Sequence, residues 1–369
     1  MRAWSGKNGN TLKVCFIAGR EPEYQRNRVL IRALRAAGVE LSEVTSGASN
    51  YALRFPAVLW RMLRQHGFEP DIYFVGFLGH PIVPVLRALS SKPIAFDPFI
   101  SVFDTLCNDR QRFKPDSPAG KLCFKMDQWA CQAADLVFLD TDTHIEYFAS
   151  DFSQPREKFH RIWVGADDRL YYPRPAGRRA DDGAIEVFYY ATFQPLHGVD
   201  VVLEAAELLD GREDIRFHLV GKGPELKRLR ERLEARLARG KCTWEQWVPE
   251  EELPARIARA DICLGGHFSS MPKAARVISG KTYQFLAMSK PVIVGNNPAN
   301  RELLSDGEDA VFVDMGDPQA LAAAITRLAG DPGLRRDLAD RGYETYRENC
   351  TPEALSGQLA SLLAGLTKG

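Results

Sequence analysis

The chain has 369 residues, of which 45% are hydrophobic and 26% are charged. A single core stops growing at about 250–300 residues, so this length favours two domains. The 48 basic and 48 acidic residues give zero formal charge, which removes any compositional reason to expect a nucleic-acid partner. A slight basic excess in residues 1–175, with 23 Lys and Arg against 19 Asp and Glu, hints at an anionic partner surface.

The seven cysteines are scattered along the chain and form no C-x-x-C pair. This pattern is typical of reduced thiols in a cytosolic protein and predicts neither a disulfide framework nor a zinc site. The amino terminus has no apolar signal segment, and no run approaches the length of a membrane span. We therefore expect a cytoplasmic protein that could touch the inner face of a membrane peripherally.

The first half alternates short apolar, β-rich runs with longer amphipathic stretches. The runs predict buried parallel strands, and the stretches predict helices that cover them. The expected order is strand 12–19, helix 25–37, strand 39–44, helix 56–66, strand 71–76, helix 80–89, strand 93–96, helix 117–132, strand 135–139, helix 143–149 and strand 159–165.

The second half restarts the same alternation after a polar stretch at 174–184. Its expected order is strand 185–191, helix 199–209, strand 215–221, helix 224–239, strand 242–248, helix 251–259, strand 261–266, helix 280–288, strand 291–295, helix 301–304, strand 310–313 and helices from 317 onward.

This alternation predicts an α/β protein with two doubly wound, Rossmann-like domains that face each other across a cleft. The expected domains are residues 1–173 and 185–350, joined by a linker at 174–184. A final helical segment, 351–369, is expected to pack back on the first domain. Ligands of such sheets bind at the carboxyl ends of the strands, where the strand order reverses.

Two glycine-containing turns follow strands of the second half. His197-Gly198 precedes a helix whose amino terminus could attract phosphate, or Gly198 simply serves a turn with an unusual φ angle. Gly221-Lys222-Gly223-Pro224 also ends a strand and opens a helix. It is neither G-x-G-x-x-G nor a Walker A loop, so alone it is a weak phosphate signal.

Three cations, Lys273, Arg276 and Lys281, follow the strand that ends at Gly265-Gly266. Arg and Lys pair well with diphosphate oxygens, and Ser279-Gly280 is typical of a helix start that would aim N–H groups at the same place. A surface loop with incidental charges is the alternative. Their clustering at the carboxyl end of a strand favours a diphosphate site.

These segments, in this order and spacing, resemble the nucleotide-binding domain of the group-1 (family 4) retaining glycosyltransferases, which have the GT-B fold. The resemblance covers most of residues 185–350 and is weaker in the first half. It is carried by Tyr190-Ala191-Thr192 with His197-Gly198, Val220-Gly221-Lys222-Gly223-Pro224, Gln284-Phe285-Leu286-Ala287, Pro291-Val292-Ile293 and Glu302-Leu303-Leu304.

The resemblance implies a nucleotide-diphosphate-sugar donor as co-substrate, and we expect neither a cofactor nor a metal ion. The donor-binding residues that it implies are Thr192, His197, Gly198, Lys222, Gly223, Lys273, Arg276, Lys281, Gln284 and Glu302. The chain departs from the family pattern, because Thr192 and His197 replace an Arg and a Lys, and Arg276 and Gln284 replace two glutamates. Gln284 can still hydrogen-bond ribose hydroxyls. We interpret the departures as a divergent subgroup with altered recognition.

The first half is expected to bind the acceptor and to supply the catalytic candidates Asp97, Asp104 and His80. A carboxylate there could orient a hydroxyl or stabilise positive charge at the anomeric carbon. The alternatives are caps, turn residues and a structural histidine. Asp140-Thr141-Asp142 mimics a metal-binding D-x-D, but it lies at a strand-to-helix junction, where an N-cap explains it.

An amphipathic helix at 54–67 carries Trp60 and several arginines, including Arg54, and arginines including Arg26 lie on the helix at 25–37. Together these could hold an anionic membrane or a lipid-linked acceptor; an ordinary packed helix is the alternative. The expected activity is retaining transfer of a sugar to a hydroxyl of a glycan, lipid-linked or small-molecule acceptor. Two alternatives stay open: a non-catalytic nucleotide-binding scaffold, and another GT-B enzyme such as a nucleotide-sugar epimerase.

Overall fold

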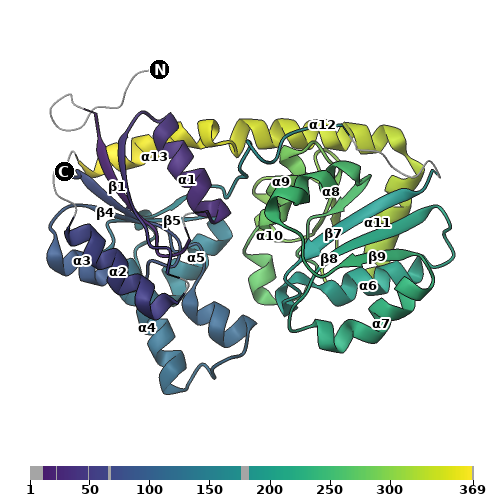
Figure 1. The fold of residues 1–369 in the computed structure, drawn as a ribbon, viewed down its shortest axis with the longest axis horizontal. Helices are drawn as coiled ribbons and strands as arrows, with labels where there is room; N and C mark the ends of the chain where they lie inside the picture. Colours follow the sequence, from purple (N-terminus) through teal and green to yellow (C-terminus); the bar gives the residue numbers. More distant parts are fainter. Residues whose placement is uncertain (1–10, 22, 49, 65–67, 176–182, 368–369) are drawn as a thin grey trace. The chain divides into compact units, whose positions relative to one another are not determined.

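The computed structural model describes residues 11–21, 23–48, 50–64, 68–175 and 183–367. Backbone contacts divide the chain into two compact units (Figure 1). Unit 1 comprises Met1–Gly165 and Asn349–Gly369, and unit 2 comprises Ala166–Glu348. Most of the linker expected at 174–184 lies outside the described residues.

Unit 1 is built on a six-stranded parallel sheet with the order β2-β1-β3-β4-β5-β6. Its strands are β1 (Lys13–Ile17), β2 (Glu40–Val44), β3 (Ile72–Val75), β4 (Ile94–Phe96), β5 (Leu136–Leu139) and β6 (Phe159–Arg161). The chain passes from β1 to β2 on one side and then to β3 on the other. The strand order therefore reverses between β1 and β3.

Helices cover both faces of this sheet. They are α1 (Gln25–Ala36), α2 (Tyr51–Leu63), α3 (Ile82–Leu89), the π-helix η1 (Asp104–Asp109), α4 (Pro118–Ala133), α5 (Asp142–Asp151), the short η2 (Arg156–Lys158) and α13 (Pro352–Leu366). Cys15, Ile17 and Val75 face a core shared with α2, α3, α4 and α5. The carboxyl-terminal helix α13 packs against α1, so it belongs to this unit although it comes last in the chain.

Unit 2 contains a second six-stranded parallel sheet, with the order β12-β11-β10-β7-β8-β9. Its strands are β7 (Ile185–Ala191), β8 (Ile215–Gly221), β9 (Cys242–Glu245), β10 (Ile262–Leu264), β11 (Val292–Gly295) and β12 (Val311–Val313). The order reverses between β7 and β10, because β9 ends one side of the sheet and β10 starts the other.

The helices of unit 2 are η3 (Pro195–His197), α6 (Val199–Leu208), α7 (Leu226–Ala238), η4 (Glu250–Glu252), α8 (Leu253–Arg259), η5 (Pro272–Ala275), α9 (Gly280–Ala287), α10 (Pro298–Arg301), α11 (Pro318–Gly330) and α12 (Pro332–Asn349). Alternate residues of β7 face opposite layers. Val187 and Tyr189 join a core with α6, α7 and α11, whereas Phe188 and Tyr190 contact Phe285 of α9. Figure 1 shows β7 and β8 between α6 and α8.

The predicted α/β class with two doubly wound sheets is confirmed, and many elements differ in extent from the expected bounds. The helix expected at 56–66, for example, spans Tyr51–Leu63. The strands expected at 159–165 and 242–248 end at Arg161 and Glu245. The helix expected at 301–304 occupies Pro298–Arg301, because the Asn297 side chain caps it and proline fits the first turn. Within the described ranges, no helix is both long and apolar enough to cross a membrane.

Candidate functional site

The turn after β7 requires glycine at 198. Gly198 has φ +66°, a conformation that L side chains rarely adopt. A Cβ atom there would lie 2.5 Å from the backbone nitrogen of Ser269, in the segment after β10. Gly198 therefore has the unusual φ angle that was expected if it serves a simple turn. The same glycine also brings together two segments at the strand-order reversal, where ligands of such sheets bind.

The turn after β8 lies against the same place. Gly221 has φ +144°, and Cβ atoms at Gly221 and Gly223 would overlap the carbonyl oxygens of Ala191 and Thr192. These glycines permit the β8 turn to contact the β7 turn. The side chains of Lys222 and Thr192 are exposed beside this contact.

Lys281 supplies a buried positive charge at this edge. It is the second residue of α9, its side chain is only 5% exposed, and its Nζ lies 4.5 Å from the centre of the Tyr189 ring. Within the described part of the chain, Nζ makes no hydrogen bond and no ion pair. Burial lowers the pKa of Lys281 to about 7. A buried ammonium without a counter-ion is costly, so such a group is a candidate for binding an anion.

Two neutral histidines lie beside this lysine. The rings of His197 and His267 stack with centroids 5.4 Å apart and planes 6° apart. Desolvation, and then the charges of Lys281 and Lys273, lower the pKa of His197 to about 3. The pKa of His267 also falls, because of burial, His197 and the same lysines. Both rings therefore stay neutral near pH 7 and can hydrogen-bond a ligand without adding charge.

The remaining donor candidates lie on α9, on η5 and after α10. Gln284 is buried, and its Oε1 accepts a hydrogen bond from the Tyr190 hydroxyl. Lys273 is buried on η5, and its charge acts on both stacked histidines. Arg276 is half-buried just after η5, and Glu302 is half-buried where α10 ends. The structure thus gathers His197, Gly198, Lys273 and Lys281. The donor roles of all ten residues stay predictions.

Asp97, the first catalytic candidate, lies in the interior of unit 1. Its carboxylate is fully buried, and the Arg26 guanidinium donates to both of its oxygens at 2.9–3.2 Å. Arg26 also donates to the carbonyl oxygens of Ile162 and Trp163. Burial raises the pKa of Asp97, and Arg26 opposes that shift. This arrangement gives Asp97 a structural partner, while its catalytic role stays a prediction.

His80 and Asp104 belong to a group of polar residues around Asp127 of α4: His80 lies beside Asp127, and Asp104 is connected to it through Ser101. The buried His80 has Nε2 3.1 Å from Asp127 Oδ1, without hydrogen-bond alignment. Asp127 accepts hydrogen bonds from the Ser101 hydroxyl and from two backbone amides of residues 102–103. The Asp104 amide donates to Ser101, and its carboxylate accepts from Asn108. The catalytic roles of His80 and Asp104 stay predictions.

For Arg54 and Arg26, the structure favours the packed-helix alternative over contact with an anionic surface. Arg54 is 1% exposed and pairs with Glu21 at 2.8 Å, and Arg26 is fully buried. Both side chains turn inward because a carboxylate receives them there. The N-cap expected at Asp140-Thr141-Asp142 is confirmed, since the Thr141 side chain caps α5 by accepting a hydrogen bond from the His144 amide. No group of three or more His, Cys, Asp or Glu among the described residues is placed to hold a metal ion.

Tyr189 and His267 also belong to this edge, although neither is among the residues predicted from the sequence. Tyr189 supplies the ring under Lys281, and its hydroxyl donates to the carbonyl oxygen of His197. His267 directly follows Gly265-Gly266 at a strand end, so its position was a usable signal. Tyr189 carried none, because an aromatic residue within a buried strand is typical of a core.

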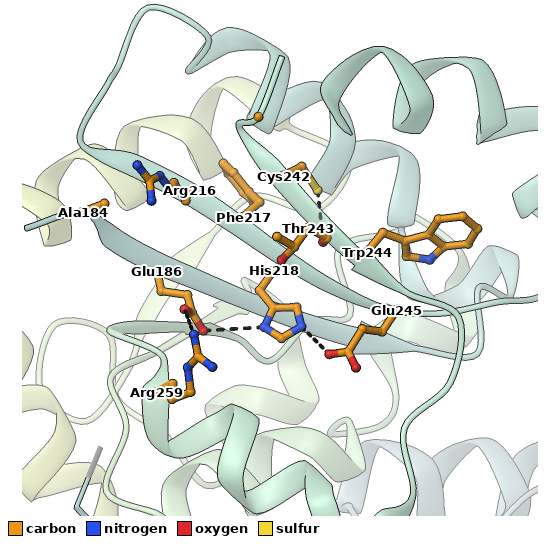
Figure 2. A pocket seen from close by; sticks show the side chains of 11 residues that line it. Ala184, Glu186, Arg216, Phe217, His218, Cys242, Thr243, Trp244, Glu245 and Arg259 are labelled. Atoms are coloured by element: carbon orange, nitrogen blue, oxygen red, sulfur yellow. Dashed lines mark hydrogen bonds and ion pairs between the residues drawn. The ribbon is translucent and has the colours of Figure 1, made fainter. Parts of the chain in front are cut away.

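A separate pocket of about 370 Å³ lies at the other end of the unit 2 sheet, near the start of β7 and β8 (Figure 2). His218 lies between Glu186 and Glu245, with Nε2 2.8 Å from the Glu245 carboxylate. Arg256 pairs with Glu245 at 3.1 Å, and Arg259 lies 3.8 Å from Glu186. These charged groups pair with one another, and none of the predicted donor residues lines this pocket.

Comparison with known proteins gives a family match in the second unit. The family model described as glycosyl transferases group 1 matches residues 175–345. An alpha-D-kanosaminyltransferase of Streptomyces kanamyceticus is 24% identical over 64% of this chain and 62% of its own length. A GDP-mannose-dependent phosphatidylinositol monomannoside mannosyltransferase of Mycolicibacterium smegmatis is 27% identical over 63% of each chain. The chain spans less than two thirds of the length of these curated relatives.

Solved structures match the whole fold. Sucrose-phosphate synthase from Thermosynechococcus elongatus superposes with a TM-score of 0.73 at 16% identity, over 97% of this chain and 99% of that one. Anabaena HepE, solved in complex with UDP, gives 0.71 at 15% identity, over 96% and 100%.

The two parallel sheets, each with its strand-order reversal, and these superpositions define an α/β protein of the GT-B fold. Within it, residues 175–345 match the family model of the glycosyl transferases group 1, which confirms the resemblance seen in the sequence.

Proposed function

We propose that this protein is a glycosyltransferase that moves a sugar from a nucleotide-diphosphate sugar to a hydroxyl acceptor, with retention of anomeric configuration. The observation that carries the proposal is Lys281, a buried ammonium without an ion-pair partner among the described residues, at the strand-order reversal of a group-1 domain. A diphosphate is the anion that this activity would bring to such a charge. A charge-assisted hydrogen bond in a buried site is among the stronger polar interactions.

The remaining residues of this edge fit the same ligand. Lys273 adds a second cation, and the neutral His197 and His267 offer hydrogen bonds beside the diphosphate. Gln284, oriented by the Tyr190 hydroxyl, is proposed to bind the donor ribose. The leaving diphosphate would take the proton of the acceptor hydroxyl on the same face of the sugar. In that route, catalysis depends mainly on cations that stabilise the negative charge of the leaving diphosphate.

Named relatives suggest the setting of the reaction. They include a lipopolysaccharide core glycosyltransferase of Rhizobium meliloti and a putative colanic acid glycosyltransferase of Escherichia coli. We therefore infer a hexosyltransferase of polysaccharide or glycolipid biosynthesis, cytoplasmic and able to touch a membrane. The membrane contact is supported by exposed apolar side chains of unit 1, including Leu53, Trp60, Leu122 and Trp129.

A nucleotide panel tests the donor site. We expect one nucleoside diphosphate among UDP, GDP, ADP and dTDP to raise the thermal midpoint, because a ligand that binds only the folded state stabilises it. Arg276→Ala should weaken that shift, and Arg347→Ala, which removes an arginine of α12, serves as the control. No shift with any nucleotide would contradict the donor site. Binding without turnover on any acceptor would instead favour the scaffold alternative.

Donor affinity should fall as pH rises above about 7. An anion raises the pKa of the lysine that it contacts, so above the free-state pKa Lys281 must take up a proton to bind. Affinity should then fall by up to about tenfold per pH unit until the bound-state pKa is reached. A nucleotide-sugar is the suitable probe, because its phosphate diesters stay ionised, and calorimetry is the measurement.

Two observations would check the origin of this pH dependence. His197, with its pKa at about 3, stays neutral throughout the range and contributes nothing. Lys281→Arg keeps its charge, so any binding that it retains should be independent of pH. If the affinity of the protein without substitutions does not change with pH across this range, Lys281 does not contact the diphosphate.

A further inference from the structure

We propose that unit 1 holds an acceptor subsite for an amphiphile, a molecule in which an apolar group is joined to an anionic phosphate or carboxylate. The inference rests on the proposed glycosyl transfer and adds the chemical class of the acceptor. It starts from a pocket of about 380 Å³ at the carboxyl ends of β1, β3 and β4. The strand order of unit 1 reverses there, so this is the edge where a doubly wound sheet binds ligands.

The walls of this pocket are mainly apolar. They are formed by half-buried side chains from α2, from the segments after β3 and β4, from η1 and from α4, among them Phe55, Leu78, Ile100, Leu106 and Met126. Apolar surface that is partly open to water gains free energy when a ligand covers it, at about 25 cal/mol per Å². An apolar group of the ligand fits this lining.

Three arginines, Arg20, Arg110 and Arg112, lie on the same pocket. Arg20 pairs with Glu21 at 3.0 Å and stacks on Tyr24. The exposed guanidinium groups of Arg110 and Arg112 make no ion pair within the described residues. The described residues that line the pocket include no carboxylate, so the charge of this lining is positive and complements an anion.

The backbone around the pocket is shaped in uncommon ways. Leu78, in its lining, and Phe99, just before it, have φ of +60° and +62°, which non-glycine residues rarely adopt. Leu106 and Thr105 belong to a π-helix, a rare form that occurs frequently at functional sites. Such strain persists where the surrounding structure holds it, and it clusters at ligand sites.

His80 gives the pocket a polar group for the acceptor hydroxyl. Its ring lines the pocket and is 1% exposed, and Nδ1 has no hydrogen-bond partner among the described residues. The Phe96 ring holds the imidazole edge-on at 5.1 Å, and Asp127 lies beside Nε2. A buried ring nitrogen without a partner favours a ligand that can hydrogen-bond to it.

The test uses the full chain and three probes, which are hexyl phosphate, hexanol and inorganic phosphate, with binding measured by calorimetry. We expect hexyl phosphate to bind at least about tenfold more tightly than either fragment, since it alone engages both parts of the site. Arg110→Gln with Arg112→Gln should remove most of that gain. The matched control is Lys121→Gln with Lys125→Gln, which removes two exposed charges of α4 outside the pocket lining.

Vesicles of phosphatidylcholine with phosphatidic acid distinguish the two sources of such a ligand. Flotation with these vesicles that depends on Arg110 and Arg112 would assign the occupant to a membrane lipid, and hexyl phosphate binding without flotation would assign it to a soluble acceptor. Equal binding of hexyl phosphate and hexanol, or binding unaffected by the arginine changes, would overturn the proposal. Nucleotide binding, measured in parallel, reports separately on the donor site. Failure of the acceptor proposal can therefore be distinguished from failure of the proposed donor site.

Discussion

Replacing Lys281 with methionine should abolish donor binding and at the same time stabilise the protein. The ammonium is 5% exposed and has no ion-pair partner among the described residues, so folding must bury an uncompensated charge. Methionine keeps the length of the side chain and its contact with the Tyr189 ring. We expect a gain of about 1–3 kcal/mol in the free energy of unfolding. Nucleotide affinity should drop at least about a hundredfold.

The direction of the pH effect on stability follows from the same pKa. Folding lowers the pKa of Lys281 from 10.5 to about 7, so the folded state disfavours the charged form. The penalty is complete below about pH 7 and fades as pH rises toward the unfolded value. The gain from Lys281→Met should therefore be largest at or below neutral pH, as measured by chemical denaturation.

Lys227→Met, on the exposed face of α7, is the matched control and should change neither property appreciably. A destabilised Lys281→Met protein would show that the lysine has a structural role. Unchanged nucleotide affinity in a folded Lys281→Met protein would remove the central contact of the proposed donor site.

The sequence could predict this edge of unit 2 because its signals are local. Gly198 and Gly223 each follow an apolar strand, and Lys281 lies at a recognisable helix start. The strand positions, together with the rule that the carboxyl ends of parallel strands share one edge, were enough to bring them together. The burial of the Lys281 side chain could not be predicted. A lysine in a glycine-rich segment suggests exposure, and only the packed fold shows that Tyr189 lies beneath it.

The first unit was harder to predict because its polar residues pair over long sequence distances. Arg26 reads as one of several basic residues along a helix, and Asp97 reads as a strand-end carboxylate. They lie 71 residues apart, and no local pattern indicates that each neutralises the other. The π-helix at 104–109 also leaves no periodic signal, since a single turn is too short to establish a period.

The buried pair of Arg26 and Asp97 leads to the second large prediction. Asp97→Asn should destabilise unit 1 by about 3–5 kcal/mol, because it leaves the guanidinium buried without its counter-charge. Arg26 would keep its bonds to the carbonyl oxygens of Ile162 and Trp163, but these groups carry no formal charge to balance the guanidinium. The measurement is the free energy of unfolding, obtained by denaturant titration of the full chain.

A double variant separates structure from catalysis at Asp97. Arg26→Met with Asp97→Leu removes both charges and should recover most of the lost stability, because well-packed apolar residues often replace a buried ion pair at little cost. If Asp97 acts only through this pair, the folded double variant should retain transfer activity once an acceptor is known. If stability returns and turnover does not, Asp97 acts on the substrate, and the catalytic prediction made from the sequence is correct. If the double variant is no more stable than Asp97→Asn, the pair contributes by its hydrogen-bond geometry, and the charge-burial argument is wrong.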